Sequence, residues 1–313
     1  MKKIMFALVA AGAAAVMADA IESANVVGYV DHSMADGRKE MKGQPFQMTS
    51  GAAVNLNDLV PMNGSAVCDH GQFRLWWWNT DTNWGDKRMG NKYATWCSYY
   101  YDENDPQADE GFVWDVNCWA YFAADDDQGD MPLRFVGDYA KTFEAGEGFF
   151  VQPACANPKL VCSGEVIGSG DTVNAMRKVG YVDGQKQLVT PPFPVSVALN
   201  DIVPMNGNVI CDHGQFKLWW WNTDTSWGDK RMGNKYATWC SYYYDENDPQ
   251  SDEGFVWDVN CWAYFAADDD QGDMPLRFVG DYAKTFAVGE GFYVQPACAN
   301  PYLAFPNPFY VAE

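Results

Sequence analysis

The chain repeats one long stretch of its own sequence almost unchanged. Residues 67–158 and 210–301 align without gaps at an offset of 143 (210 − 67). A repeat of this length indicates one folding unit used twice, so any fold considered for the chain must contain two copies of that unit. Such close identity also indicates recent duplication, so a repeated residue is not thereby a functional one. The seven aligned positions that differ are Val67/Ile210, Arg74/Lys217, Asn83/Ser226, Ala108/Ser251, Glu144/Ala287, Ala145/Val288 and Phe150/Tyr293.

The N-terminus predicts export. Two lysines precede an apolar, Ala-rich stretch at residues 4–17, and an Ala-Asp-Ala sequence at residues 18–20 fits a small-x-small cleavage site. These features are typical of a secretory signal peptide at residues 1–20. They predict a secreted or cell-surface protein whose mature chain begins at Ile21. The apolar stretch is shorter than the about 20 residues that span a bilayer, so we expect no membrane insertion.

The chain is strongly acidic. It has 21 basic and 42 acidic side chains, a net charge of −21. Without residues 1–20 these counts become 21 − 2 = 19 and 42 − 1 = 41, a net charge of −22. Such a surface repels nucleic acid and anionic lipid, which excludes both as partners, and it suits divalent cations, cationic partners or a salty medium. The apolar content of 48% predicts a folded chain rather than a disordered one.

The cysteines follow the repeat. Four per copy in an exported chain predict two disulfide bonds per copy, with the connectivity left open. Zinc is the rival interpretation, but no two of these cysteines have the close spacing of paired zinc ligands. Cys162 is the odd cysteine, because Phe305 occupies its counterpart position. An intermolecular bridge, a free thiol and a buried small hydrophobe are all open for it. The eight predicted disulfide cysteines are Cys68, Cys97, Cys118 and Cys155, matched by Cys211, Cys240, Cys261 and Cys298.

Short aromatic and β-branched runs predict strands throughout both copies. Gly, Pro, Asn and Asp separate these runs, which is typical of antiparallel β-structure. The sequence therefore predicts an all-β protein of two tandem, near-identical β-sandwich or β-roll domains, stapled by disulfides. In the first copy the runs lie at residues 72–78, 93–101, 112–114, 119–122 and 149–153.

The domain boundaries follow from the repeat and from a Gly/Ser-rich segment between the copies. After the signal peptide at residues 1–20 we expect a first module at residues 21–166 and a second module at residues 179–313. A linker at residues 167–178 joins them. Each module opens with a similar short strand, at residues 27–31 and 179–183.

Both edges of the first module resemble a known group of proteins. The opening sequence IESANVVGY at residues 21–29, with AGEGFFV at residues 145–151 and SGEV at residues 163–166, carries the resemblance. The chain is similar to a paralogous, functionally uncharacterised group of secreted proteins from verrucomicrobial-type bacteria. The resemblance implies secretion and a β-domain, and it implies no catalytic residues. The cysteines and the doubling depart from the single-module pattern of that group.

The tryptophans all lie within the repeated sequence, and three consecutive ones in each module stand out. On a strand Trp76 and Trp78 point one way and Trp77 the other, so one face is covered by protein and the other is free for contact. An exposed Trp/Tyr platform suits sugar rings and equally suits a subunit interface, while most tryptophans belong in the core with satisfied indole groups. The candidate aromatics are Trp76, Trp77, Trp78, Trp219, Trp220 and Trp221.

Acidic loops suggest calcium as the one cofactor worth testing. Carboxylate-rich loops are the ligands that Ca²⁺ prefers, and three adjacent aspartates repel one another without a cation. The segment at residues 79–86 resembles a calcium loop but departs from the EF-hand pattern at Trp84, where Gly is needed. A solvated acidic surface is the alternative. The candidate ligands are Asp81, Asp86, Asp125, Asp126, Asp127, Asp130, Asp224, Asp229, Asp268, Asp269, Asp270 and Asp273.

Catalysis finds little support in the sequence. The chain has three histidines, and neither a cofactor fingerprint nor a phosphate-binding loop. His70 precedes Gly71 and suggests a turn residue. Glu147 and Glu290 lie between glycines, which predicts a tight turn before a general acid. We therefore predict a protein that is not an enzyme and has no catalytic residues.

Two functions remain. The leading hypothesis is a secreted structural protein that assembles with itself into a filament, sheath or surface layer. Repeated surfaces favour head-to-tail growth, edge-like strands at residues 24–30 and 301–311 could pair with a neighbour, and Cys162 could add a covalent link. The alternative is a carbohydrate-binding protein in which the doubling gives avidity for a polysaccharide.

Overall fold

The structure, a computed structural model, describes residues 27–48, 52–79, 90–101, 105–120, 141–166, 175–222, 233–244, 249–263 and 284–310. Throughout these ranges the chain is all-β, as predicted, with short 3-10 turns such as η2 (Leu56–Asp58) and η4 (Leu199–Asp201) and no α-helix. In the same ranges no helix has the length and apolarity that crossing a membrane requires. The predicted signal peptide and the predicted calcium ligands lie outside the described residues.

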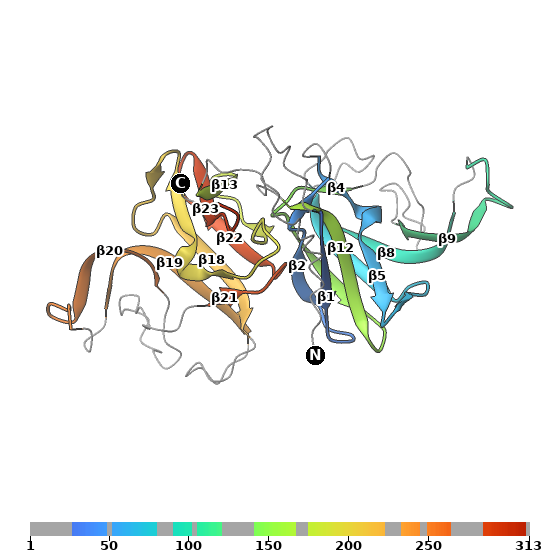
Figure 1. Cartoon of the computed structure of the whole chain (residues 1–313), viewed down its shortest axis with the longest axis horizontal. Helices are drawn as coiled ribbons and strands as arrows, with labels where there is room; N and C mark the ends of the chain where they lie inside the picture. The colour runs from blue at the N-terminus through green and yellow to red at the C-terminus, as the bar shows by residue number, and fades with distance from the viewer. Residues whose placement is uncertain are drawn as a thin grey trace, which may run out of the picture.

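The first module contains two larger sheets and one small one (Figure 1). The first sheet has the order β1-β12-β5-β6, with β3 also paired to β12: β1 (Val27–Ser33), β12 (Pro158–Val166), β5 (Val60–Asn63), β6 (Ala66–Val67) and β3 (Phe46–Gln47). The second has the order β2-β11-β7-β8-β9: β2 (Glu40–Gly43), β11 (Gly148–Pro153), β7 (Phe73–Asn79), β8 (Gly90–Tyr101) and β9 (Phe112–Ala120). The small sheet pairs β4 (Val54–Asn55) with β10 (Thr142–Phe143).

The second module repeats these strand orders. One sheet has the order β13-β23-β16-β17: β13 (Met176–Gly180), β23 (Pro301–Pro306), β16 (Val203–Asn206) and β17 (Val209–Ile210). The other has the order β14-β22-β18-β19-β20: β14 (Gln187–Val189), β22 (Phe292–Pro296), β18 (Phe216–Asn222), β19 (Gly233–Tyr244) and β20 (Phe255–Ala263). The small sheet pairs β15 (Val197–Ala198) with β21 (Thr285–Phe286).

The two larger sheets of each module pack on a shared core. In the first module Leu160 from one sheet and Leu75 from the other belong to the same fully buried cluster. Trp96 and Trp119 are in this cluster, and their indole nitrogens donate to the carbonyls of Cys68 (3.0 Å) and Leu59 (2.8 Å). Buried indoles with satisfied N–H groups are what the core interpretation of most tryptophans predicts. The second module repeats both hydrogen bonds, at 3.0 and 2.8 Å.

The predicted strands are confirmed with one change. Residues 112–114 and 119–122 were expected to be two separate runs, but Phe112 to Ala120 is one strand, β9. Its register against β8 shifts between Cys97 and Tyr99. Asp115 has a φ of 58°, the left-handed conformation, and its counterpart Asp258 has the same value. This bulge takes up the polar residues that had suggested a break.

Two further expectations need correction. Residues 301–306 are not an edge, because β23 lies between β13 and β16 in its sheet. Within the described residues β1 does lie at a sheet edge, and its pairing with a neighbouring chain stays a prediction. The second module begins earlier than residue 179, because β13 starts at Met176 inside the predicted linker. All nine cysteines are thiols in the structure, so the disulfide bonds stay a prediction.

Candidate functional site

The two modules meet through matching surfaces. An isolated bridge joins Lys42 of the first module to Glu290 of the second, and another joins Val189 of the second to Glu147 of the first. Lys42 and Val189 occupy equivalent positions, since each lies opposite the matching phenylalanine of its own sheet. The glutamates are equivalent at the repeat offset of 143 (290 − 147). The contact is therefore close to two-fold symmetric, and Figure 1 shows β2 of one module beside β22 of the other.

Backbone hydrogen bonds fasten this contact in equivalent places. The Gly43 N–H donates to the Gly289 carbonyl (3.0 Å), and the Thr190 N–H donates to the Gly146 carbonyl (2.9 Å). The Gly291 N–H also donates to the Met41 carbonyl (3.0 Å). Strand edges that would otherwise be open are thereby occupied at the centre of the molecule. A two-fold contact of this kind closes on itself and does not propagate head-to-tail.

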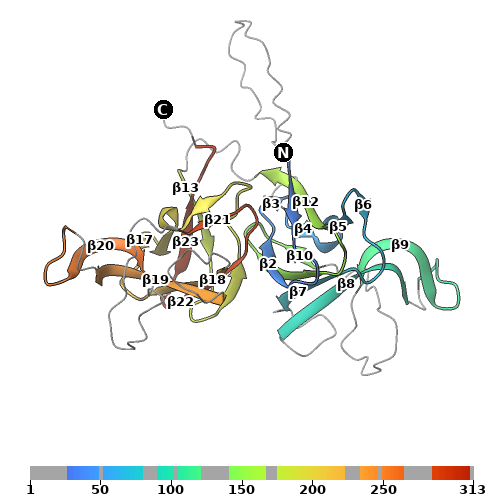
Figure 2. The same ribbon diagram turned by 90° about the horizontal axis from the view of Figure 1, so that it is seen from below.

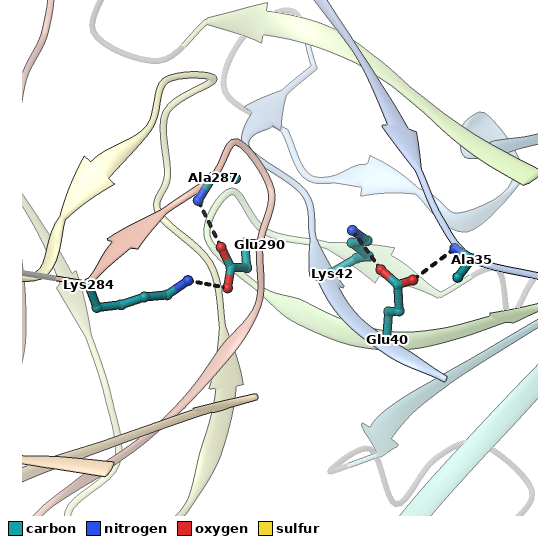
Figure 3. Close-up of polar contacts among 6 residues, drawn as sticks. All are labelled: Ala35, Glu40, Lys42, Lys284, Ala287 and Glu290. Atoms are coloured by element: carbon teal, nitrogen blue, oxygen red, sulfur yellow. Dashed lines mark hydrogen bonds and ion pairs between the residues drawn. The ribbon is translucent and has the colours of Figure 1, made fainter. Parts of the chain in front are cut away.

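The two Gly-Glu-Gly turns at this contact are held by lysines. Figure 3 shows Glu290 accepting from Lys284 Nζ (2.6 Å) and from the Ala287 N–H (2.9 Å). Glu147 is held in the same way by Lys141 Nζ, at 2.6 Å. The prediction of tight turns at both glutamates is confirmed, and a lysine partner at this distance gives each carboxylate a structural role. Across the contact, Figure 3 also shows Lys42 in an ion pair with Glu40 (3.1 Å).

Two glycines allow the modules to approach this closely. A Cβ at Gly289, whose φ is +63°, would collide with the imidazole ring of His32. A Cβ at Gly43 would collide with the side chain of Thr190. Gly43 and Thr190 are equivalent positions, so the symmetry breaks where two side chains would not fit.

An aromatic row crosses this contact on one face of the molecule. In the first module Tyr93 lies opposite Trp76, and Trp76 opposite Phe150. The second module has the same cross-strand order, and the rings of Phe150 and Tyr293 meet between the modules at 6.0 Å. All six residues are partly exposed. We call this set the central row: Tyr93, Trp76, Phe150, Tyr293, Trp219 and Tyr236.

A lysine lies over each half of the central row. Lys39 Nζ is 4.3 Å from the ring centroid of Trp76 and 4.6 Å from that of Phe150. Lys186 holds the equivalent place over Trp219 and Tyr293, at 4.6 and 4.3 Å. Burial lowers the pKa of Lys39, as expected for an ammonium group resting on ring faces. The row therefore combines flat apolar faces with two cationic hydrogen-bond donors.

The predicted tryptophans divide between this surface and the core. Trp77 and Trp220 are only 3% and 2% exposed, so as candidates for a contact surface they were wrong. Trp76 and Trp219 are in the central row, and Trp221 is 45% exposed. The predicted alternation of faces is confirmed for these residues. The side chain of Trp78 lies outside the described residues.

A second aromatic surface was missed from the sequence. The rings of His70 and Tyr99 stack at 4.3 Å with an interplanar angle of 2°, and Tyr99 lies 4.9 Å from Trp114. Phe112 stacks on Trp114 at 5.5 Å. Trp114 is 54% exposed although it was expected in neither the platform nor an interface. We call these four residues the distal ladder.

Each distal ladder is complete within its own module. His213, Tyr242, Trp257 and Phe255 repeat it with ring separations of 4.4, 5.0 and 5.4 Å along the same order. The Nδ1 atom of His70 accepts a hydrogen bond from the backbone N–H of Ser98 (3.3 Å), which fixes the ring. Figures 1 and 2 show β9 and β20, which carry the ladder tryptophans, at opposite ends of the molecule. The turn prediction for His70 is confirmed by its place before Gly71, whose φ is +78°.

The predicted calcium ligands and the odd cysteine, Cys162, have different outcomes. No group of three or more His, Cys, Asp or Glu side chains suited to a metal ion occurs in the described part of the chain. The twelve predicted calcium ligands all fall in its gaps, so calcium stays a prediction. Cys162 is fully buried in the core of the first module, which removes it as an accessible intermolecular link.

Comparison with known proteins gives no identification, because the chain matches no protein-family profile, no curated protein and no solved structure.

Proposed function

We propose that the chain is a non-enzymatic carbohydrate-binding protein that holds a polysaccharide along the central row. The observation that carries the proposal is the continuity of the row across the module contact. Sugar rings bind by apolar contact with flat aromatic faces and by hydrogen bonds from neighbouring polar groups. Trp and Tyr are also among the residues that dominate binding energy at protein surfaces.

The dimensions of the row support an extended ligand rather than a single sugar. Its six rings stand on six strands, and strands lie about 4.8 Å apart, so the row extends over roughly 25 Å. The neighbouring rings of Phe150 and Tyr293 are 6.0 Å apart, so the module contact leaves no wide break. Lys39 and Lys186 would donate to hydroxyl or carboxylate oxygens of the polymer. A secreted location, as the N-terminal sequence predicts, would bring the surface to such a ligand.

Self-assembly is the second candidate, supported now by one observation. The distal ladders expose Trp114 and Trp257, at 54% and 56%, on strands that end their sheets at opposite ends of the molecule. Two such ends could join copies into a filament. The other arguments for self-assembly are weaker, because the module contact is closed, β23 is internal and Cys162 is buried.

We further propose that each module is a β-sandwich domain of the resembled secreted group. The two larger sheets facing one shared core support the sandwich. Phe309 packs against the cores of both modules, which supports a tandem pair that acts as one body.

The test uses two matched double variants of the mature chain. Binding is measured by retention on insoluble polysaccharides and by affinity electrophoresis in gels that contain soluble neutral or acidic ones. We expect Trp76→Ala with Trp219→Ala to weaken binding by about 100-fold or more, because each ring is expected to contribute about 1.4 kcal/mol or more. Trp114→Ala with Trp257→Ala should bind as the parent does.

Two results would overturn the proposal. One is a parent chain that binds no polysaccharide of either charge class. The other is a row variant that keeps full affinity. If the ladder variant alone loses regular assemblies seen by electron microscopy, self-assembly becomes the better account.

A further inference from the structure

The eight repeated cysteines come together in pairs. The Sγ atoms of Cys68 and Cys155 are 3.8 Å apart, and those of Cys211 and Cys298 are also 3.8 Å apart. All four are buried. Cys68 directly follows β6 and Cys155 lies just beyond β11, so this pair connects the two larger sheets of its module.

The other cysteines face each other across one hairpin. Cys97 of β8 lies directly opposite Cys118 of β9, and Cys240 lies opposite Cys261 in the second module. Directly opposed residues point to the same face of a sheet with Cβ atoms about 4.5–5.5 Å apart, close to the separation that a disulfide spans. Cys118 also packs against the small cluster that contains Cys97.

Cys162 has a different environment. It lies in β12 opposite Val30, is fully buried, and packs in the main core of the first module. Phe305 fills the equivalent place in the second module and is buried there too. This position is an apolar core site, which a thiol fills as a small hydrophobe.

We propose that the exported chain carries four disulfide bonds, Cys68–Cys155, Cys97–Cys118, Cys211–Cys298 and Cys240–Cys261, and keeps Cys162 as a thiol. Each bond forms by thiol–disulfide exchange: two thiols release two protons and two electrons, and a disulfide oxidant such as oxidised glutathione becomes two thiols. The inference is independent of carbohydrate binding. It selects one connectivity from those that the sequence leaves open.

The environment of the thiols indicates when the bonds form. Burial raises the pKa of Cys68 to about 12 and that of Cys97 to about 12. Near neutral pH the folded, reduced chain therefore holds little of the thiolate that reacts in exchange. Oxidation should consequently be fast during folding and slow once the cores have closed.

The test is a peptide map of the full mature chain refolded in a glutathione redox buffer. Free thiols are alkylated with iodoacetamide in denaturant, and the chain is digested with trypsin without reduction. Cys97 and Cys118 share the tryptic peptide 93–134, so their bond appears as an unalkylated peptide lighter by two hydrogens. The Arg74/Lys217 and Lys159/Tyr302 differences separate the long-range pairs of the two modules.

We expect the four bonds named above and alkylation at Cys162 alone. Cys162→Ala should give the same four bonds, which controls for shuffling through the spare thiol. Complete alkylation of all nine cysteines after folding in oxidant would overturn the proposal. So would any bond that joins the two modules or includes Cys162.

Discussion

The central row and the distal ladders are built from the same kinds of side chain, yet they depend on the fold in different ways. Each ladder is made by one hairpin and one turn of the same module, so duplication produces two separate copies. The row exists only because the modules dock, with Phe150 meeting Tyr293 across the contact. Duplication therefore gives two ladders but one long row. Of these two kinds of surface, only the row requires both modules.

Some of the differences between the copies lie at the contact between the modules. Three of the seven differing positions, Glu144/Ala287, Ala145/Val288 and Phe150/Tyr293, lie in or beside the turns and strands that meet at the contact. Ala145 packs against the core of the second module. Phe150 and Tyr293 are a differing pair whose rings meet each other directly across the contact.

The largest predicted effect on stability distinguishes a residue of the central row from its neighbour in the core. Trp219 and Trp220 are neighbours on β18 but point to opposite faces, and Trp220 is only 2% exposed. We expect Trp220→Ala to lower the free energy of unfolding by about 3–5 kcal/mol, because it leaves a large cavity. Trp219→Ala should cost less than about 1.5 kcal/mol. Equilibrium unfolding in guanidinium chloride measures both, and equal losses would contradict the assignment of faces.

Removing a hairpin disulfide should loosen a ladder without touching the row. The Cys97–Cys118 bond would close a loop of 22 residues (118 − 97 + 1). Loop-closure entropy gives such a bond about 3 kcal/mol of stability. We expect Cys97→Ser with Cys118→Ser to lower the unfolding free energy of the oxidised chain by that amount. The reduced parent and reduced variant are the control, and they should differ much less; polysaccharide binding should persist.

A drop in pH should destabilise the contact between the modules through His32. His32 is buried against Gly289 beside Lys42, and burial, assisted by the lysine charge, lowers its pKa from 6.5 to about 3. The unfolded chain binds a proton below pH 6.5 that the folded chain refuses, so stability falls as the pH drops from about 6.5 towards 3. Between pH 6.5 and 4.5 this amounts to about 2 kcal/mol.

The His32→Phe variant isolates this effect from the many carboxylates. The Nε2 atom of His32 has no hydrogen-bond partner in the described residues, so a phenylalanine leaves no polar atom unsatisfied at that position, although it loses the hydrogen bond to the Gly43 backbone. In thermal melts across pH 4–7, the parent should lose stability relative to the variant as the pH falls, because only the parent carries the imidazole that refuses a proton when folded. Parallel curves would show that His32 does not titrate in this way.

The smallest effect comes from separating the modules with one methyl group. Gly289→Ala would place a Cβ against the His32 ring, whereas Gly207→Ala has the same φ of +63° and no atom within 4 Å. Both variants carry similar backbone strain. We expect Gly289→Ala alone to raise the Kd for polysaccharide about tenfold, because it shifts the two halves of the row apart. Equal behaviour of the two variants would mean that the row does not depend on the contact.

The sequence predicted the parts of this picture that depend on local pattern. Alternation along the Trp76–Trp77 run was enough to predict that the two side chains point to opposite faces, but not which of them is exposed. Glycines on both sides of Glu147 and Glu290 were enough to predict turns. The left-handed Asp115 was not predictable, since an aspartate in that conformation leaves no distinct local pattern and its bulge merges two expected strands into one.

The surfaces themselves depend on contacts between distant residues. His70 precedes β7 and Tyr99 lies near the end of β8, and neither residue signals in the sequence that their rings stack. The central row needs the docking of two modules through Gly43, Thr190 and Gly289, whose roles appear only when backbones approach. The hairpin cysteine pairs likewise follow from strand register, and the other two pairs from the packing of one sheet on the other, neither of which composition encodes.

The most direct test of the account is the binding of a polysaccharide fragment to single row variants, followed by isothermal titration calorimetry. The parent chain should bind one fragment that spans both modules. If the row is one surface, Trp76→Ala and Trp219→Ala should each raise the Kd about tenfold or more while the stoichiometry stays at one per chain. A parent stoichiometry of two that each single variant reduces to one, with the Kd unchanged, would contradict the continuous row and indicate two independent sites.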